Sequence, residues 1–204
     1  MNYLAHIHIA DYSQTSIVGN LLGDFMKGAN KDNFNQALHQ GIALHQSVDS
    51  FTDCHYSVLA LKPLFAQYRR FAGIVIDILF DHILAKHFTQ YHSLTLAEFA
   101  SRTYQQLEKE KQLLTHANIR LPERFNVSSQ KMIEMDWLTS YARASSCQQA
   151  LKRTGQRLKR PVDLSLCWPL FATHREAFEQ AFHHFYPELL LHVTRLGKTF
   201  NAEE

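Results

Sequence analysis

The chain has 204 residues, of which 46% are hydrophobic and 20% charged, and a formal net charge of +2 at pH 7. This length suits one domain that buries a substantial core, and we expect residues 1–204 to form it. With only seven glycines and five prolines, the composition leaves little room for a loop-rich or all-β architecture. The small charge argues neither for nor against nucleic acid, and no nucleic-acid partner is expected.

Cysteine usage and hydropathy indicate the compartment. The three cysteines include no CxxC pair, which argues against a disulfide framework or a thiolate zinc site and suits a reducing compartment. The opening residues lack the basic and apolar regions of a signal peptide. The most apolar run, residues 71–84, carries two aspartates and is shorter than the ~20 apolar residues that cross a bilayer. We therefore expect a cytoplasmic protein with no membrane insertion.

The first segment, residues 2–10, contains His6 and His8. Two positions apart, they would share a face of a strand but diverge by about 200° on a helix. A metal-dependent hydrolase barrel can begin with such a strand, but that fold usually needs ~250 residues and repeated strand signals. Because neither is present, we interpret the segment as a short helix or an extended lead-in that delivers one histidine inward.

Residues 16–28 predict a helix, because Ser13, Thr15 or Ser16 can act as an N-cap, apolar residues recur at helical spacing and Gly28 supplies a stop. Asp24 lies among these apolar residues near the C-terminal end, where the helix dipole disfavours negative charge. A solvent-facing carboxylate is one interpretation of Asp24. Its unfavourable position suggests instead that it has a cationic partner.

A longer helix is predicted over residues 33–53, with His45, Asp49 and Asp53 four residues apart on one face. A histidine and an aspartate at i and i+4 can bind one ion, or one can orient the other as a ligand. The alternative is the solvated polar face that amphipathic helices present. Taken alone, this stripe favours the solvated face.

The apolar helix predicted over residues 69–87 holds Asp77, Asp81 and His82. A buried carboxylate is unfavourable unless a cation or a donor satisfies it, and residues four apart share a helix face. A shared metal ion is the simplest partner. In the alternative, the two arginines at the start of this helix pair with the aspartates, and His82 is an ordinary core histidine.

The rest of the chain also predicts helices. One begins or is interrupted at Pro63, a TxxE capping box opens another at Thr95, and Pro187 separates the last two. The predicted ranges after the capping box are 95–114, 132–144, 145–158, 170–186 and 188–200. Strand-like alternation is confined to the first ten residues, so the predicted fold is an all-α, single-domain helical bundle.

Oddly placed aspartates and histidines therefore recur on three predicted helices, and their convergence on one site would explain them. They are Asp24, then His45 with Asp49, then Asp77 with Asp81 and His82. Mixed histidine and carboxylate ligands favour Mn²⁺, Fe²⁺, Mg²⁺ or Zn²⁺. A site of this kind can activate water and polarise a phosphoryl oxygen, so phosphoester hydrolysis is the natural chemistry.

The same residues resemble a known family. The motifs are Asn2, Leu4-Ala5-His6, His8 and Ala10; Gly19-Asn20-Leu21-Leu22 with Asp24-Phe25; Gly41-Ile42, His45, Asp49 and Thr52-Asp53; Asp77, Asp81-His82 and Leu84; and Phe185-Tyr186-Pro187. In combination they are specific and cover nearly the whole chain, which resembles the bacterial acyl carrier protein phosphodiesterases, also called ACP hydrolases. The resemblance implies an HD-domain-like fold, because that family is regarded as a distant all-helical relative of the HD-domain phosphohydrolases.

The resemblance further implies hydrolysis of the phosphodiester that joins 4′-phosphopantetheine to a serine of acyl carrier protein, with Mn²⁺ as the preferred cofactor. It implies a metal near Asp24, His45, Asp49, Asp77 and Asp81, with His6 and His82 as further candidates. Catalytic roles are expected for Asp24, His45, Asp49, Asp81 and His82. Basic residues that would steer the acidic carrier protein are Lys27, Arg69, Arg70 and, in the basic run 152–160, Arg157 and Arg160.

Two features differ from the relatives. Gln46 follows His45 where many members have an arginine, and Asp81-His82 reverses the His-Asp order that names the HD superfamily. Two other functions stay open. One is a metal phosphohydrolase acting on a nucleotide or another small phosphoester, although no glycine-rich phosphate loop supports it. The other is a non-catalytic helical binding module, which predicts that no divalent metal binds.

Overall fold

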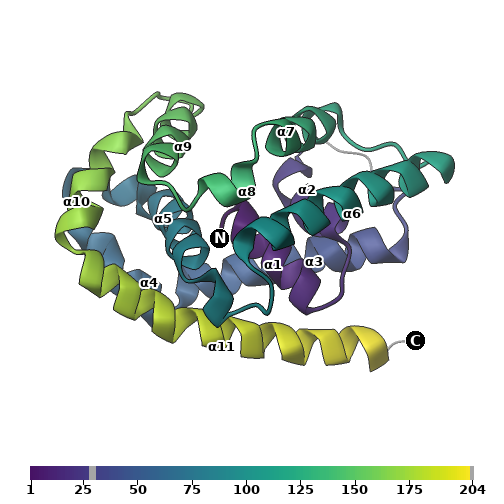
Figure 1. The fold of residues 1–204 in the computed structure, drawn as a ribbon, viewed down its shortest axis with the longest axis horizontal. Coiled ribbons are helices and arrows are strands. Elements are labelled where there is room, and N and C mark those ends of the chain that lie inside the picture. Colours follow the sequence, from purple (N-terminus) through teal and green to yellow (C-terminus); the bar gives the residue numbers. More distant parts are fainter. Residues whose placement is uncertain (28–30, 203–204) are drawn as a thin grey trace.

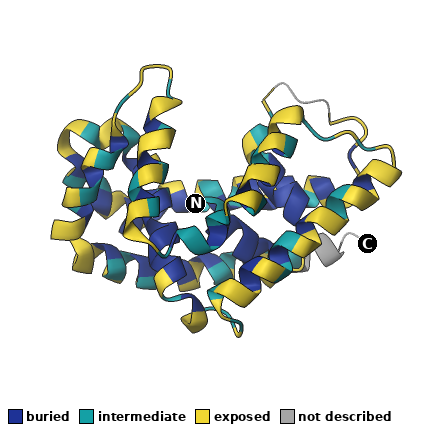
Figure 2. Cartoon of the chain, turned by 45° about the horizontal axis from the view of Figure 1, so that its top comes forward, coloured by how far each residue is buried: buried dark blue, intermediate teal, exposed yellow. Residues whose placement is uncertain are grey.

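The computed structural model describes residues 1–27 and 31–202, and every regular element in these ranges is a helix (Figure 1). The predicted all-α class is therefore confirmed. Buried apolar side chains from most helices form one hydrophobic cluster, and Figure 2 shows the buried faces turned toward one another along the interior. None of the described helices is both long and apolar enough to cross a membrane.

The first four elements build one half of the interior. α1 is almost fully buried, so both His6 and His8 lie inside the protein, where one was expected. α2 and α3 pack very closely, because a Cβ added at Gly41 would lie 2.7 Å from the backbone nitrogen of Asn20. Gly28, the predicted helix stop, lies outside the described residues. The bounds are Tyr3–Tyr12 for α1, Ile17–Leu22 for α2, Gly23–Phe25 for the 3-10 helix η1 and Gln36–Cys54 for α3.

The next elements carry the second acidic helix. Pro63 lies in the first turn of a 3-10 segment, where its missing N–H needs no partner, as predicted. α5 is the apolar helix with Asp77 and Asp81, and nearly all of its side chains are buried. The bounds are Tyr56–Leu61 for α4, Lys62–Phe71 for η2, Ala72–Lys86 for α5 and Phe88–Gln90 for η3.

Between α5 and the C-terminal helices, one prediction is confirmed and one is wrong. Thr95 and Glu98 form the expected capping box. No helix spans 132–144, because Asp136 adopts a left-handed conformation (φ 45°, ψ 60°) that ends α7, and its carboxylate then caps α8. α7, which starts directly after Pro122, was not predicted. The bounds are Leu96–His116 for α6, Glu123–Glu134 for α7, Trp137–Ser140 for α8 and Ala144–Gln156 for α9.

The C-terminal end differs from the expectation that Pro187 separates two helices. Pro187 lies inside one long helix, α11, which runs along one edge of the molecule against α3, α4 and α5 (Figure 1). The proline is exposed, whereas Tyr186 and Leu189 beside it are fully buried. Packing of this apolar stripe therefore outweighs the loss of one backbone hydrogen bond. The bounds are Leu164–Cys167 for η4, Trp168–Thr173 for α10 and Arg175–Ala202 for α11.

Candidate metal centre

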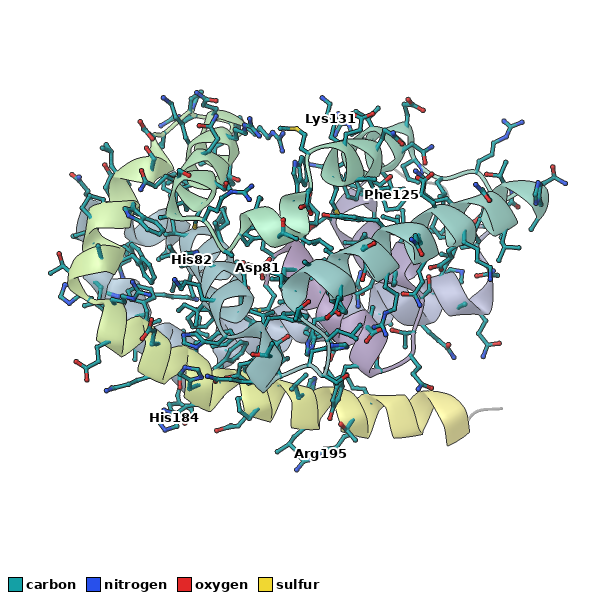
Figure 3. The ribbon with its side chains drawn as sticks, in the orientation of Figure 1. Asp81, His82, Phe125, Lys131, His184 and Arg195 are labelled. Carbon is teal, nitrogen blue, oxygen red and sulfur yellow. The ribbon has the colours of Figure 1, made fainter. Side chains whose placement is uncertain are left out.

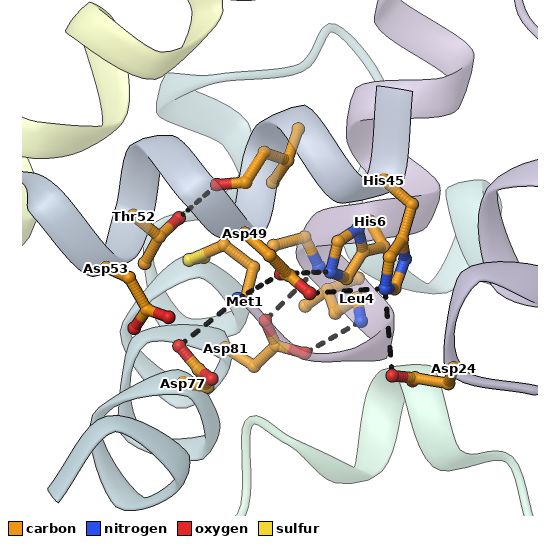
Figure 4. Close-up of polar contacts among 12 residues, drawn as sticks. Met1, Leu4, His6, Asp24, His45, Asp49, Thr52, Asp53, Asp77 and Asp81 are labelled. Atoms are coloured by element: carbon orange, nitrogen blue, oxygen red, sulfur yellow. Dashed lines mark hydrogen bonds and ion pairs between the residues drawn. The ribbon is translucent and has the colours of Figure 1, made fainter. Parts of the chain in front are cut away.

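Side chains from four elements meet beside the N-terminus of α1 (Figure 4). The ligand atoms of His6 on α1 and of His45 and Asp49 on α3 all lie within 4.8 Å of one another. Asp24 on η1 and Asp77 on α5 complete this acidic cluster, as the contacts below show. The structure thus brings together most of the residues that the sequence singled out, from positions more than 70 residues apart.

Asp49 is the central member of the cluster. Its Oδ1 lies 3.2 Å from Nε2 of His6, and its Oδ2 lies 3.2 Å from Nε2 of His45. Burial would raise the pKa of the Asp49 carboxyl, but the contacts with His45, His6 and the amino group of Met1 hold it well below its usual range. Asp49 is therefore ionised, and it bridges the two imidazoles.

His6 is oriented by Asn20, which the sequence analysis did not assign a role. Nδ1 of His6 lies 3.0 Å from the side-chain oxygen of Asn20, which can only accept. Burial lowers the pKa of His6 to about 3, so the ring is neutral and carries one N–H. That hydrogen can serve Asn20 from Nδ1 or Asp49 from Nε2. With the hydrogen at Nδ1, the lone pair of Nε2 is free to bind a cation.

His45 is held by close packing. Its ring stacks on that of His6 with 3.9 Å between centroids. A Cβ added at Gly23 would overlap the His45 ring, so only glycine leaves room for the imidazole there. On the open side, Oδ1 of Asp24 lies 3.6 Å from Nε2 of His45. Burial raises the pKa of Asp24, and the charge of Asp49 adds to this while His45 opposes it.

Asp77 joins the cluster through a cation. The amino group of Met1 lies 3.1 Å from Oδ1 of Asp49 and 3.1 Å from Oδ1 of Asp77. Burial works against the charge on this amino group, but the two carboxylates raise its pKa to about 10. The space between Asp49 and Asp77 is therefore one that favours positive charge.

Asp81 has a different partner from Asp77, although both lie on one face of α5. Its two oxygens accept hydrogen bonds from the backbone N–H groups of Leu4 (2.7 Å) and Ala5 (3.2 Å). The side chain is fully buried, and burial raises its pKa to about 7 although both amides favour the charged form. Since Asn2 provides no side-chain cap for α1, Asp81 caps that helix from a distance and thereby positions His6.

His82 points away from the cluster, and Figure 3 shows it on the same helix as Asp81. Its Nδ1 donates to the backbone oxygen of Tyr141 at 2.6 Å, and its ring packs edge-on against Trp168 and Phe171. The structure places His82 in an ordinary core position. Among the described residues, neither Asp77 nor Asp81 pairs with an arginine, so that alternative finds no support.

The predicted substrate-binding residues separate into two groups. All five are exposed, and Arg157 lines a cavity of ≈ 490 Å³ whose wall also includes Asn2 and Tyr3. The other four do not belong to the lining of that cavity; they are Lys27, Arg69, Arg70 and Arg160. Asn20 and Gly23 could have been suspected from the sequence as an amide and a glycine among apolar residues, but nothing in the spacing names their partners.

The donors fit a divalent cation. Imidazole nitrogens and carboxylate oxygens together suit Mn²⁺, Fe²⁺ or Zn²⁺, and no thiolate is present that would favour a softer ion. A hydrogen bond from Nδ1 of His6 to Asn20 leaves Nε2 for an ion, which is how histidine ligands are usually oriented. The fold and the site thus define an all-helical protein with a histidine and carboxylate centre suited to a divalent ion.

The relatives of the chain agree with this class. A family profile described as acyl carrier protein phosphodiesterase matches residues 1–189, and the chain belongs to that family. A protein of this name from Serratia proteamaculans is 32% identical over 93% of this chain and 96% of its own length. One from Pectobacterium atrosepticum is 32% identical over 98% of both chains, and one from Photorhabdus laumondii is 31% identical over 93% of both. No solved structure matches the chain, so the HD-domain-like relationship stays a prediction.

Proposed function

We propose that this chain is a divalent-metal-dependent phosphodiesterase that releases 4′-phosphopantetheine from the serine of holo-acyl carrier protein, giving apo-carrier protein. Family membership supports the substrate. The metal is supported by one observation above all, the ligand atoms of His6, His45 and Asp49, which all lie within 4.8 Å of one another. The unpaired cysteines are consistent with a cytoplasmic location, where the carrier protein would be met.

His6, His45 and Asp49 would hold the ion, with Asp24 and Asp77 at the edge of the same centre. Mn²⁺ is the ion that we propose. A divalent ion there supplies Lewis-acid stabilisation of the phosphoryl oxygens and activates water for attack on phosphorus. In a phosphodiester hydrolysis this stabilisation is most valuable as negative charge develops in the transition state.

The remaining chemistry falls to the protein side chains. Asn20 would hold the His6 hydrogen at Nδ1 so that Nε2 binds the ion, and Asp81 holds the start of α1 so that His6 faces the cluster. Asp24 is about half exposed and has a raised pKa, since it is partly buried beside Asp49. It is therefore the carboxyl placed to exchange a proton with water or with the departing serine oxygen.

The test is incubation of the protein with holo-acyl carrier protein and Mn²⁺, followed by mass spectrometry of the carrier. We expect loss of the prosthetic group, absence of that loss with a chelator, and its absence with Asp49→Asn. Turnover of small phosphodiesters is measured in parallel. Turnover of a small phosphodiester or a nucleotide with an intact holo-carrier would contradict the proposed substrate, and activity that survives complete metal removal would contradict the metal.

A further inference from the structure

A cavity of ≈ 490 Å³ lies between α8, α9 and the start of α1. Its wall includes Tyr3, which is three residues before His6. Asn2 also lines it, and the amino group of the preceding residue, Met1, lies 3.1 Å from Asp49 and 3.1 Å from Asp77. The first three residues therefore connect the cavity to the acidic cluster, so that a molecule bound at one can reach toward the other.

Positive charge lines this cavity without matching negative charge. Arg143, Arg153 and Arg157 contribute to its lining, and no aspartate or glutamate does. Within the part of the chain that the structure describes, none of the three forms an ion pair with a carboxylate. These arginines line a cavity that begins at Asn2, beside the acidic metal centre. Such a cavity attracts an anionic molecule, one part of which can reach the metal.

The rest of the lining is both aromatic and polar. Trp137 lies against Tyr3 with 5.6 Å between ring centroids, and Tyr141 is buried behind them. Hydroxyl and amide side chains complete the wall, namely Asn2, Ser140, Ser145, Ser146, Gln149 and Thr154. Cavities that take small ligands measure about 300–1,000 Å³ and combine apolar walls with a few polar groups. This one has the size for a single chain of atoms and is too small for a folded protein.

We propose that this arginine-lined cavity holds the 4′-phosphopantetheine arm of the substrate, with the scissile phosphodiester at the metal centre. The inference rests on the proposed function. The arm carries a phosphate at one end and then alternates methyl and methylene groups with a hydroxyl and two amides. The arginines of the lining meet the phosphate end. The aromatic wall covers the methyl groups, and the short polar side chains bind the amides.

Two variants and one control test the cavity. Ala150→Trp places a large side chain in its wall, and the double variant Arg153→Gln with Arg157→Gln removes two charges from it. The matched control is the double variant Lys109→Gln with Arg124→Gln, which removes two exposed cations from α6 and α7, outside the cavity. Thermal melts establish that each variant is folded. All measurements use the full chain with Mn²⁺.

Calorimetric titration with free 4′-phosphopantetheine is the first readout. We expect binding to the parent protein and to the control, and at least tenfold weaker binding to Ala150→Trp and to the arginine double variant. Kinetics are the second readout. The KM for holo-carrier protein should rise at least tenfold in both cavity variants and change less than twofold in the control.

Unchanged KM and unchanged 4′-phosphopantetheine affinity in the folded cavity variants would overturn the inference. So would tighter binding of AMP than of 4′-phosphopantetheine, or a loss of apo-carrier binding in these variants with 4′-phosphopantetheine affinity preserved, because the cavity would then serve a nucleotide or the carrier surface. Failure of the proposed function looks different: the parent protein would leave holo-carrier protein intact whatever the cavity variants do.

Discussion

The side-chain oxygen of Asn20 accepts a hydrogen bond from Nδ1 of His6, and this contact decides which nitrogen of the imidazole faces Asp49. The two residues lie on neighbouring helices, α1 and α2, at a buried position. The centre therefore depends on a residue that never touches the ion.

Replacing Asn20 should weaken the metal centre. Asn20→Leu removes the acceptor, so that Nδ1 loses its partner and the proton can move to Nε2, where it donates to Asp49. We expect Mn²⁺ affinity to fall roughly 10- to 100-fold, the usual effect of losing a residue that orients a metal ligand. Titration of Mn²⁺ followed by electron paramagnetic resonance measures this. Asn20→Asp keeps an acceptor and should retain more affinity than Asn20→Leu; equal affinities in both variants would contradict the orienting role.

Metal removal should lower the stability of the folded protein. An ion that binds only the folded state adds about 2.7 kcal/mol at 100 times its Kd, so Mn²⁺ should raise the Tm and a chelator should reverse the rise. Asp49→Ala should abolish the Mn²⁺-dependent shift. Glu188→Gln, which removes the partner of His55 elsewhere on the molecule, should keep it. A Tm of the parent protein that does not respond to Mn²⁺ would argue against the centre.

Gly23→Ala should damage the centre without changing any candidate ligand. The added methyl group would overlap the ring of His45, so the ring must move away from Asp49 and Asp24. A displacement of about 1 Å near reacting groups can cost about 10²-fold in rate, and we expect a loss of that order in turnover together with weaker Mn²⁺ binding. Gly197→Ala is the control, because nothing lies within 4 Å of its new Cβ. There we expect only a gain in stability of about 1 kcal/mol.

Asp81 should make the stability of the metal-free protein fall as the pH rises. Its pKa is about 7 in the folded state against 3.8 as the ordinary value. The folded state therefore binds one more proton than the unfolded state between about pH 4 and pH 7. The stabilisation is complete below this window and is lost as the pH rises through about 7, a change on the order of a few kcal/mol.

Urea unfolding across this pH range measures the effect. Asp81→Asn has no carboxyl to titrate, so its free energy of unfolding should lack this component, and the difference between variant and parent should follow the stated window. The difference in free energy of unfolding between variant and parent removes the contributions of His6 and His8, which both proteins share. The lowered pKa values of these histidines make stability rise with pH, opposite to the effect of Asp81. Parallel pH profiles for variant and parent would show that Asp81 is not the group responsible.

Local patterns in the sequence predicted the helical elements well, and helical spacing predicted the face of α3 that carries His45 and Asp49. The spacing of His45 and Asp49 placed both on one face, and the structure puts them 3.2 Å apart. The same rule placed Asp77 and Asp81 together on α5. Spacing could not separate their roles. Asp77 pairs with the amino group of Met1 and Asp81 with the backbone of α1, and both partners lie more than 70 positions away in the sequence.

The wrong predictions also have tertiary causes. Pro187 breaks no helix because buried aromatic residues before it, such as Tyr186, and the buried Leu189 and Val193 after it hold α11 against the core. Asp136 ends a helix that its neighbours favour, since its left-handed backbone lets the carboxylate accept from Thr139 N and the Tyr104 hydroxyl. Asn20 was among the family motifs, but its role follows from the packing of α2 against α1, which brings it to His6 and which no single segment reveals.

The cap that Asp81 gives to Leu4 and Ala5 also sets an order for biosynthesis. During synthesis, the amides at the start of α1 leave the ribosome before Asp81, whose carboxylate caps them. Asp81 follows about 75 residues later. Until α5 has emerged and docked, those amides depend on water, and the imidazole of His6, the next residue, has no fixed direction. Shortened chains that stop before α5 would accordingly be unable to assemble the centre at all.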